Sequence, residues 1–91
     1  MAELRHEIKV INRLGLHARA AAKFVSTASS FSSHVEIEKN GHRVNGKSIM
    51  GVMMLAAGIG SQLVLHVNGN DANPCMDALT ALINDKFGEA E

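Results

Sequence analysis

Aromatic side chains are scarce in this chain of 91 residues, which has no tryptophan, no tyrosine and an aromatic content of only 3%. Hydrophobic residues still make up 46% of the sequence, so we expect one small domain over residues 1–91 with a core of aliphatic side chains. Basic and acidic residues balance at nine each, and no basic patch is interleaved with aromatic residues. This pattern argues against a nucleic-acid partner.

Cysteine and long apolar runs are also lacking. The single Cys75 excludes an intramolecular disulfide and fits a reducing compartment. The first residues hold no apolar signal segment, and no apolar run approaches the ~20 residues of a membrane span. No histidine spacing is typical of metal ligands, so we expect no bound metal. We also expect no cofactor and no membrane insertion, and we expect the protein to be a cytoplasmic monomer. The histidines expected on strand surfaces or edges are His6, His34, His42 and His66.

Hydrophobic periodicity divides the chain into seven segments. Alternating residues predict strands, and apolar residues at helical spacing predict helices. The expected strands are 4–12, 35–38, 42–44 and 62–68, and the expected helices are 18–29, 49–57 and one from Asn73 to a stop at Gly88. Each strand has one charged face, which favours an antiparallel sheet with one solvated side and an α+β fold.

The dipeptide Asn40-Gly41 lies between two short strand-like runs. It predicts a type I′ hairpin turn, because both central positions of that turn need positive φ. A two-residue loop then places an apolar pair on one face and an oppositely charged pair on the other. The expected pairs are Lys39 with His42, Glu38 with Arg43, and Ile37 with Val44.

The stretch Gly15-Leu16-His17-Ala18-Arg19 joins the first predicted strand to the first predicted helix. Backbone N–H groups at a helix start lack intrahelical partners and, with the helix dipole, favour anions. Arg19 adds a permanently charged fork suited to phosphate, and His17 adds a ring nitrogen that can be neutral and nucleophilic near pH 7. The stretch therefore predicts that a phosphoryl group rests on His17, stabilised by Arg19 and by backbone N–H groups at Ala18 and Arg19.

Residues 49–57 are apolar almost all round, although a short helix on an open sheet cannot bury every side. Val52 and Leu55 are the better core candidates. The remaining apolar side chains predict an exposed patch of the kind that docks partners, for which methionine is an adaptable contact residue. The residues expected in this docking patch are Ile49, Met50 and Met53.

The segment from Gly41 to Ser48 also matches the P-loop pattern G-x-x-x-x-G-K-S. A P-loop follows a strand as one loop before a long helix in a larger α/β domain. Here the Asn-Gly turn explains Gly41, and pairing with Ile37 explains Val44, so most of the supposed loop is predicted strand. We therefore reject a nucleotide-binding interpretation, and we assign Ser48 as the N-cap of the following helix.

Two motifs carry a family resemblance: Leu-Gly-Leu-His-Ala-Arg before the first helix and Val-Asn-Gly-Lys-Ser-Ile-Met-Gly-Val-Met-Met-Leu-Ala-Ala-Gly at the second. At this spacing the chain resembles the phosphocarrier protein HPr family over essentially its whole length. The resemblance implies an open-faced β-sandwich, with three helices on one face of a four-stranded antiparallel sheet in the order βαββαβα. It implies a carrier rather than an enzyme: enzyme I, charged from phosphoenolpyruvate, phosphorylates His17, Arg19 contacts the phosphoryl group, and an enzyme IIA component receives it.

The resemblance also implies how this carrier meets its partners. Ser48 matches a regulatory serine that HPr kinase/phosphorylase modifies in some bacteria, and the docking patch matches the surface where enzyme I and enzyme IIA bind. Ala20 departs from the proline usual in the family, which predicts a looser loop with the same chemistry. Membership in the sugar branch or the nitrogen-related branch stays open, the alternative being a regulatory docking module of the nitrogen-related phosphotransferase system.

Overall fold

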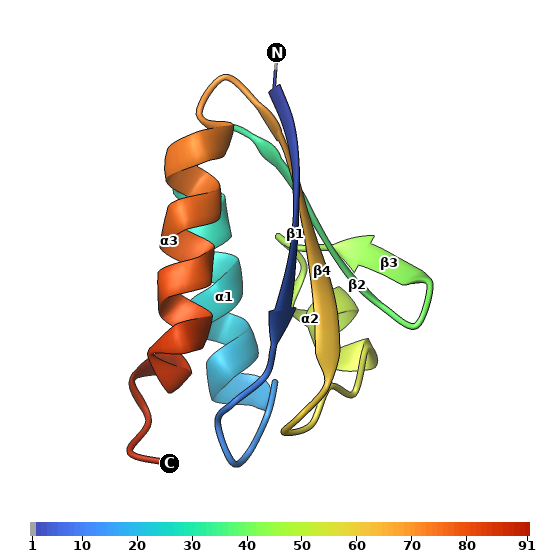
Figure 1. Ribbon diagram of the computed structural model, residues 1–91, viewed down its shortest axis with the longest axis vertical. Coiled ribbons are helices and arrows are strands. Elements are labelled where there is room, and N and C mark those ends of the chain that lie inside the picture. The colour runs from blue at the N-terminus through green and yellow to red at the C-terminus, as the bar shows by residue number, and fades with distance from the viewer. Residues whose placement is uncertain (1) are drawn as a thin grey trace.

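The computed structural model describes residues 2–91 of the chain (Figure 1). Its elements follow the predicted order βαββαβα, with a short 3₁₀ turn added after the last helix. They are β1 (Ala2–Lys9), α1 (Ala18–Ser29), β2 (His34–Lys39), β3 (His42–Asn45), α2 (Ile49–Met54), β4 (Gln62–Gly69), α3 (Ala72–Asn84) and the 3₁₀ turn (Lys86–Gly88).

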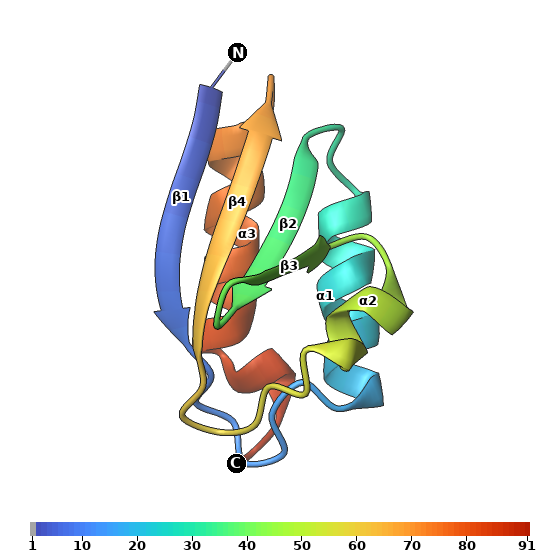
Figure 2. The ribbon, with the colours of Figure 1, turned by 90° about the vertical axis from the view of Figure 1, so that its right-hand side faces the viewer.

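The four strands form one antiparallel sheet in the order β1-β4-β2-β3. Figure 1 shows this sheet nearly edge-on, with α1 and α3 side by side along one of its faces. Figure 2 shows α2 beside α1, next to the short strand β3. Within residues 2–91 the other face of the sheet carries no helix, so the predicted open-faced β-sandwich is confirmed.

The predicted β2–β3 hairpin is confirmed residue by residue. Asn40 and Gly41 have φ values of +52° and +84°, the positive values that a type I′ turn requires. All three predicted cross-strand pairs are present in the register of β2 with β3. Two turn residues were therefore enough to set the pairing of the two strands.

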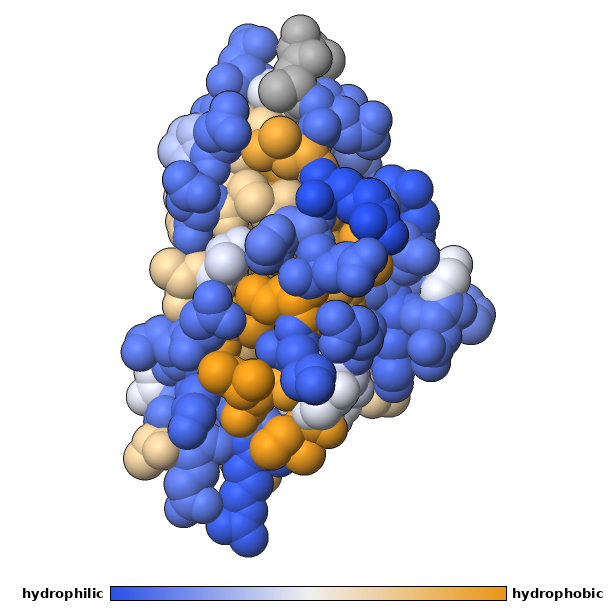
Figure 3. All heavy atoms as spheres, viewed as in Figure 1, coloured by the Kyte–Doolittle hydropathy of each residue, from blue (hydrophilic) through white to orange (hydrophobic). Residues whose placement is uncertain are grey.

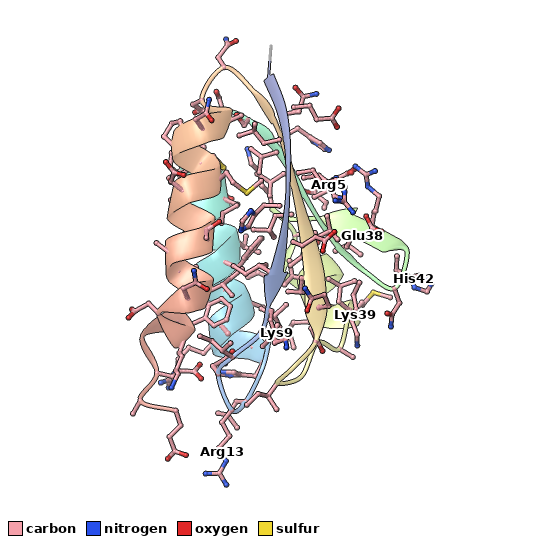
Figure 4. The ribbon with its side chains drawn as sticks, in the orientation of Figure 1. Arg5, Lys9, Arg13, Glu38, Lys39 and His42 are labelled. Carbon is pink, nitrogen blue, oxygen red and sulfur yellow. The ribbon has the colours of Figure 1, made fainter. Side chains whose placement is uncertain are left out.

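Glu38 lies opposite Arg43 as predicted, but the two side chains bond other partners. Arg43 bonds Glu36, two residues before Glu38 on β2, with 2.9 Å between Nε and Oε1. Oε1 of Glu38 lies 2.7 Å from His66 Nε2. Diagonal neighbours on a sheet are within reach of long side chains, which explains the exchange. Glu38 lies on the helix-free face (Figure 4). Hydrogen bonds from His34 and then Arg43 hold the pKa of Glu36 below its usual value.

The core between the sheet and the helices is aliphatic, as the composition predicts, apart from Phe24 and Phe87. Small residues on the buried face of α1 let that helix approach the sheet closely: Ala20, Ala21 and Ala28. Val52 and Leu55 are buried as predicted. On the outside, Figure 3 shows apolar side chains gathered along the seam between α3 and β1.

Two helices end earlier than their hydrophobic pattern predicts. α2 ends at Met54, because the backbone turns at Ala56, which has a φ of +51°. α3 ends at Asn84, and Phe87, at a φ of +55°, turns the chain before Gly88. Phe87 is buried although it lies beyond the end of α3, so the apolar pattern continues past the helix. Periodicity alone therefore extends both helices too far.

Asp71 joins the start of α3 to the turn after α1. Its carboxylate accepts hydrogen bonds from the backbone N–H groups of Ser32 and Ser33, each at 2.9 Å, and from both hydroxyl groups. These bonds, with that from the Ser33 hydroxyl as the largest cause, lower the pKa of Asp71 to about 2 from its usual 3.8. The ionised carboxylate is therefore the form that stabilises the fold.

We expect Asp71→Asn to lower the midpoint of thermal unfolding at pH 7 by about 4–8 °C, the shift that follows the loss of roughly one net hydrogen bond in a domain of this size. Because the pKa is depressed in the fold, the contribution is fully present above pH 3.8 and is lost as the pH falls through about 2. Circular dichroism melts should therefore show the gap to wild type narrowing toward pH 2. Asp77→Asn, which removes an exposed carboxylate of α3, is the control, and its midpoint of thermal unfolding should change little.

Candidate functional site

His17 is the N-cap residue of α1. Its backbone is extended, with φ −71° and ψ 177°, and its carbonyl accepts the first helical hydrogen bond from Ala21 N at 2.8 Å. Among residues 2–91 its side chain makes no capping bond to the helix. The imidazole is therefore held at the positive end of α1 while its ring remains available for other contacts.

The loop before His17 is fixed by three contacts. Leu16 is buried, and its N–H donates to Ala57 O at 2.8 Å. Gly15 packs against the backbone of Ala57 at a φ of +66°, where a Cβ atom would lie 2.4 Å from Ala57 O. Buried Asn12 donates from Nδ2 to Gly15 O at 2.8 Å. β1 ends at Lys9 rather than at residue 12 as predicted, and this releases Asn12 to brace the loop.

The C-terminal segment folds back onto this loop. Figures 1 and 2 both place the C-terminus at the end of the molecule where β1 leads into α1. Glu89 contacts His17 Nε2 through one carboxylate oxygen and accepts a hydrogen bond from Asn12 Nδ2 through the other, at 3.0 Å. The hydrogen bond with His17, followed by that with Asn12, lowers the pKa of Glu89. The carboxylate is therefore ionised beside the imidazole at neutral pH.

Sequence reasoning missed Glu89. No motif marks it, and it lies 72 positions along the chain from His17. Its neighbours in the segment explain its placement: Phe87 is buried in the core, and Lys23 Nζ donates to Phe87 O at 2.6 Å. Such long-range contacts leave no periodic signal in a sequence.

The loop and the C-terminal segment enclose an open hollow at the start of α1. Around it lie two guanidinium groups, an imidazole, two carboxylates and the start of α1, whose first backbone N–H groups have no intrahelical acceptor. Its lining residues are Arg13, Leu14, His17, Ala18, Arg19, Glu89, Ala90 and Glu91. The structure thus brings together His17, Ala18 and Arg19, the residues that the sequence predicts at one anion site.

Arg13 is a further cation at this hollow. It extends from the end of the molecule (Figure 4), and its guanidinium lies 2.8 Å from the Glu91 carboxylate. Both side chains are more than two-thirds exposed, so this ion pair contributes little to stability. Arg19 is also exposed.

Ala20, the third residue of α1, is fully buried. Its backbone N–H belongs to the first helical turn, where no intrahelical acceptor exists. A proline would remove that donor without breaking a helical bond. The looser loop expected from Ala20 stays a prediction.

The predicted docking-patch residues are exposed: Ile49 by 44%, Met50 by 70% and Met53 by 40%. The structure adds four exposed apolar side chains that the sequence analysis did not single out, Ile11, Leu14, Met54 and Ile59. Leu14 lines the hollow beside His17, so apolar surface reaches the site itself.

Ser48 is the N-cap of α2, as predicted. Its Oγ accepts a hydrogen bond from Gly51 N at 3.1 Å. β3 occupies four of the positions that match the P-loop pattern, so that segment is strand rather than a phosphate-binding loop. Within residues 2–91, no cluster of three or more His, Cys, Asp or Glu side chains is arranged to hold a metal ion, and no helix is long and apolar enough to cross a membrane.

Comparison with known proteins identifies the family. The sequence pattern of the family described as "PTS HPr component phosphorylation site" matches residues 4–85. Phosphocarrier protein HPr of Cupriavidus necator is 54% identical over 88 residues, and that of Neisseria meningitidis serogroup A is 57% identical over 88 residues. Each match covers 97% of this chain and 99% of the relative. The crystal structure of HPr-C-His from Thermoanaerobacter tengcongensis, 46% identical, aligns over 100% of both chains with a TM-score of 0.91.

The shared fold and the match to the family model place the chain among small phosphocarrier domains. The chain belongs to the HPr family of the phosphotransferase system. The resemblance drawn from the two sequence motifs is thereby confirmed, and with it the role of phosphoryl carrier that follows from the family.

Proposed function

We propose that His17 is the residue that carries the phosphoryl group, taking it from enzyme I and passing it to an enzyme IIA component. The observation that carries this proposal is the place of His17 at the N-terminus of α1, with its ring in a hollow that Arg19 also lines. A neutral imidazole attacks phosphorus, and Arg19 and the free N–H groups of Ala18 and Arg19 stabilise the charge that develops.

The openness of the hollow suits a carrier. Phosphoryl transfer depends mainly on positioning and on charge stabilisation. A shallow site at a helix end lets the active site of a partner approach His17, first to load and then to unload it. The protein then acts as substrate and donor for phosphotransferases, with no turnover of its own.

Incubation with enzyme I and phosphoenolpyruvate tests this proposal. Mass spectrometry should find one added phosphoryl group that is lost in acid, and peptide mapping under alkaline conditions should place it on His17. A stable phosphate, or an acid-labile one on another histidine, would contradict the assignment.

We further propose that the docking patch, Ile49, Met50 and Met53, binds both enzyme I and enzyme IIA. Exposed apolar surface of this kind marks interaction sites, and truncating a central contact commonly costs a complex tenfold or more in affinity. We expect Met50→Glu to raise the KM for phosphorylation by enzyme I by about tenfold or more, because docking would bury the new charge. Met50 is 70% exposed, so the fold should tolerate the substitution.

Asn73→Asp is the matched control for this experiment. It adds the same charge at an exposed position in the first turn of α3, at the opposite end of the molecule from His17 (Figure 1). Its KM should equal that of wild type. Equal KM values for Met50→Glu and Asn73→Asp would show that the patch takes no part in docking.

We also propose that phosphorylation of Ser48 by a kinase regulates docking rather than folding, since a phosphoserine is well placed at a helix N-terminus. Ser48→Ala should lower the free energy of unfolding by about 1 kcal/mol, because it removes the bond to Gly51 N. Ser48→Asp should keep the cap but place a charge beside Ile49. Urea titrations should therefore show only Ser48→Ala destabilised, and kinetics only Ser48→Asp with a raised KM for enzyme I. A raised KM in both variants would assign the effect to helix stability.

A further inference from the structure

We propose that Glu89 is a positioning residue for phosphoryl transfer: its carboxylate keeps the ring proton of His17 on Nε2, so that Nδ1 is the nucleophile in every cycle. This inference rests on the proposed role of His17 as acceptor. It assigns a function to the C-terminal segment, which none of the sequence motifs includes.

Both oxygens of the Glu89 carboxylate have partners. One contacts His17 Nε2, and the other accepts from Asn12 Nδ2 at 3.0 Å. The side chain of Glu89 is only 17% exposed, compared with 29% for His17. The pair is therefore shielded from most of the solvent that would otherwise compete for the imidazole.

Asn12 couples this carboxylate to the loop that carries His17. Its amide nitrogen donates one hydrogen to Gly15 O at 2.8 Å and the other to Glu89. Both partners are acceptors, so the amide orientation is determined by its hydrogen bonds. The opposite atom, Oδ1, is buried without a partner among residues 2–91, which is a cost to stability.

The C-terminal segment is anchored two residues before Glu89. Phe87 is buried in the core, and its carbonyl accepts a hydrogen bond from Lys23 of α1 at 2.6 Å. α1 therefore carries His17 at its start and, further along, Lys23, which holds the segment that contains Glu89. Such a brace gives the carboxylate a defined place relative to the imidazole.

The chemistry follows from what a carboxylate can accept. An ionised carboxylate has no hydrogen to donate, so its contact with Nε2 requires the hydrogen to be on Nε2. A neutral imidazole has one ring hydrogen, which leaves the lone pair on Nδ1. A carboxylate that orients a histidine in this way selects one tautomer and stabilises the cationic ring, as it does in enzymes that use such pairs.

Both transfers then balance without movement of the ring proton. On loading, the Nδ1 lone pair forms the N–P bond while the bond from phosphorus to the donor breaks, and its electron pair leaves with the donor. The phosphorylated ring is cationic with hydrogen on Nε2, opposite the Glu89 carboxylate. On unloading, the N–P bond breaks and its electron pair returns to Nδ1, so the leaving group is neutral imidazole rather than imidazolate.

Glu89→Gln tests the proposal, with Glu91→Gln as the matched control. A glutamine amide offers one acceptor and one donor group, so it cannot serve His17 and Asn12 together. Glu91 undergoes the same substitution two residues away, where its partner is the exposed Arg13. Heteronuclear spectra of the backbone should first show that both variants keep the fold.

Two measurements on these variants decide the matter. Ring ¹⁵N chemical shifts of the unphosphorylated protein should report hydrogen on Nε2 of His17 in wild type and in Glu91→Gln, and a mixture of tautomers in Glu89→Gln. Phosphorylation by enzyme I should show kcat lower by about 10–100-fold in Glu89→Gln alone, with KM unchanged. This is the range seen when a hydrogen-bond partner that orients a metal-ligating histidine is removed.

The possible failures are distinguishable. An unaltered tautomer or an unaltered kcat in Glu89→Gln would overturn the role of Glu89, while His17 would remain the acceptor. A rise in KM alone would also overturn it, because that result assigns the segment to docking. Phosphate mapped to a residue other than His17 would instead contradict the proposed acceptor, and the tautomer measurement, made without phosphate, would still report on the Glu89 contact.

Discussion

His17→Ala is expected to abolish phosphoryl carriage and to leave the fold intact. Alanine has no nucleophilic nitrogen, and no neighbouring side chain in the hollow can replace one at neutral pH. The extended backbone and the carbonyl that begins α1 do not depend on the imidazole, since among residues 2–91 the side chain makes no capping bond. Mass spectrometry after incubation with enzyme I and phosphoenolpyruvate should find no acid-labile phosphate on the variant.

The control for this experiment is His42→Ala. His42 extends from the β2–β3 hairpin (Figure 4), and its side chain is exposed, without a hydrogen-bond partner among residues 2–91. The His42→Ala variant should be phosphorylated at the wild-type rate. Competition experiments should also show that His17→Ala still binds enzyme I, because the docking patch is unchanged. Acid-labile phosphate on His17→Ala would place the acceptor elsewhere.

The second large effect is expected from Gly15→Ala. An alanine at the φ of +66° found there costs about 1–2 kcal/mol as a left-handed residue. Its Cβ would also lie 2.4 Å from Ala57 O and 2.7 Å from the Cα of Gly58, and relieving such overpacking typically costs a further ~1–3 kcal/mol. These atoms belong to the backbone, so the loop that carries His17 must move. We expect a loss of several kcal/mol in the free energy of unfolding and a fall in phosphoryl transfer.

Gly41→Ala separates the two causes. Gly41 also has a positive φ, +84°, but a Cβ there would meet no atom of the described residues within 4 Å. Gly41→Ala should therefore lose only the free energy that a left-handed alanine costs, about 1–2 kcal/mol, and transfer phosphoryl groups at the wild-type rate. Urea unfolding and enzyme I kinetics on both variants make the comparison. Equal losses in the two variants would show that contact with Ala57 is unimportant.

The features that were predictable from the sequence are those decided by residues close together in the chain. The Asn40-Gly41 turn determines its own register, because two positive φ values allow one hairpin geometry. The start of α1 is equally local: a loop glycine, His17 and an alanine-rich amphipathic run define it. Two motifs at fixed spacing were enough to indicate the family, which comparison with its members confirmed.

The features that were not predictable depend on where distant segments meet. Arg43 pairs with Glu36 rather than Glu38 because the twisted sheet brings the diagonal carboxylate within reach of a long side chain. α2 stops at Met54 where the chain turns toward the loop of His17, although its apolar pattern continues.

The sequence by itself therefore determined the class of fold, the hairpin, the helix-start histidine and the family. Only the tertiary structure decided what surrounds that histidine. Glu89 reaches the imidazole because Phe87 is buried and Asn12 is free to bridge loop and segment, and no local propensity records such contacts. Hydrophobic periodicity and turn chemistry act over a few residues, whereas the surroundings of a reacting atom are set by packing between segments that are far apart in the chain.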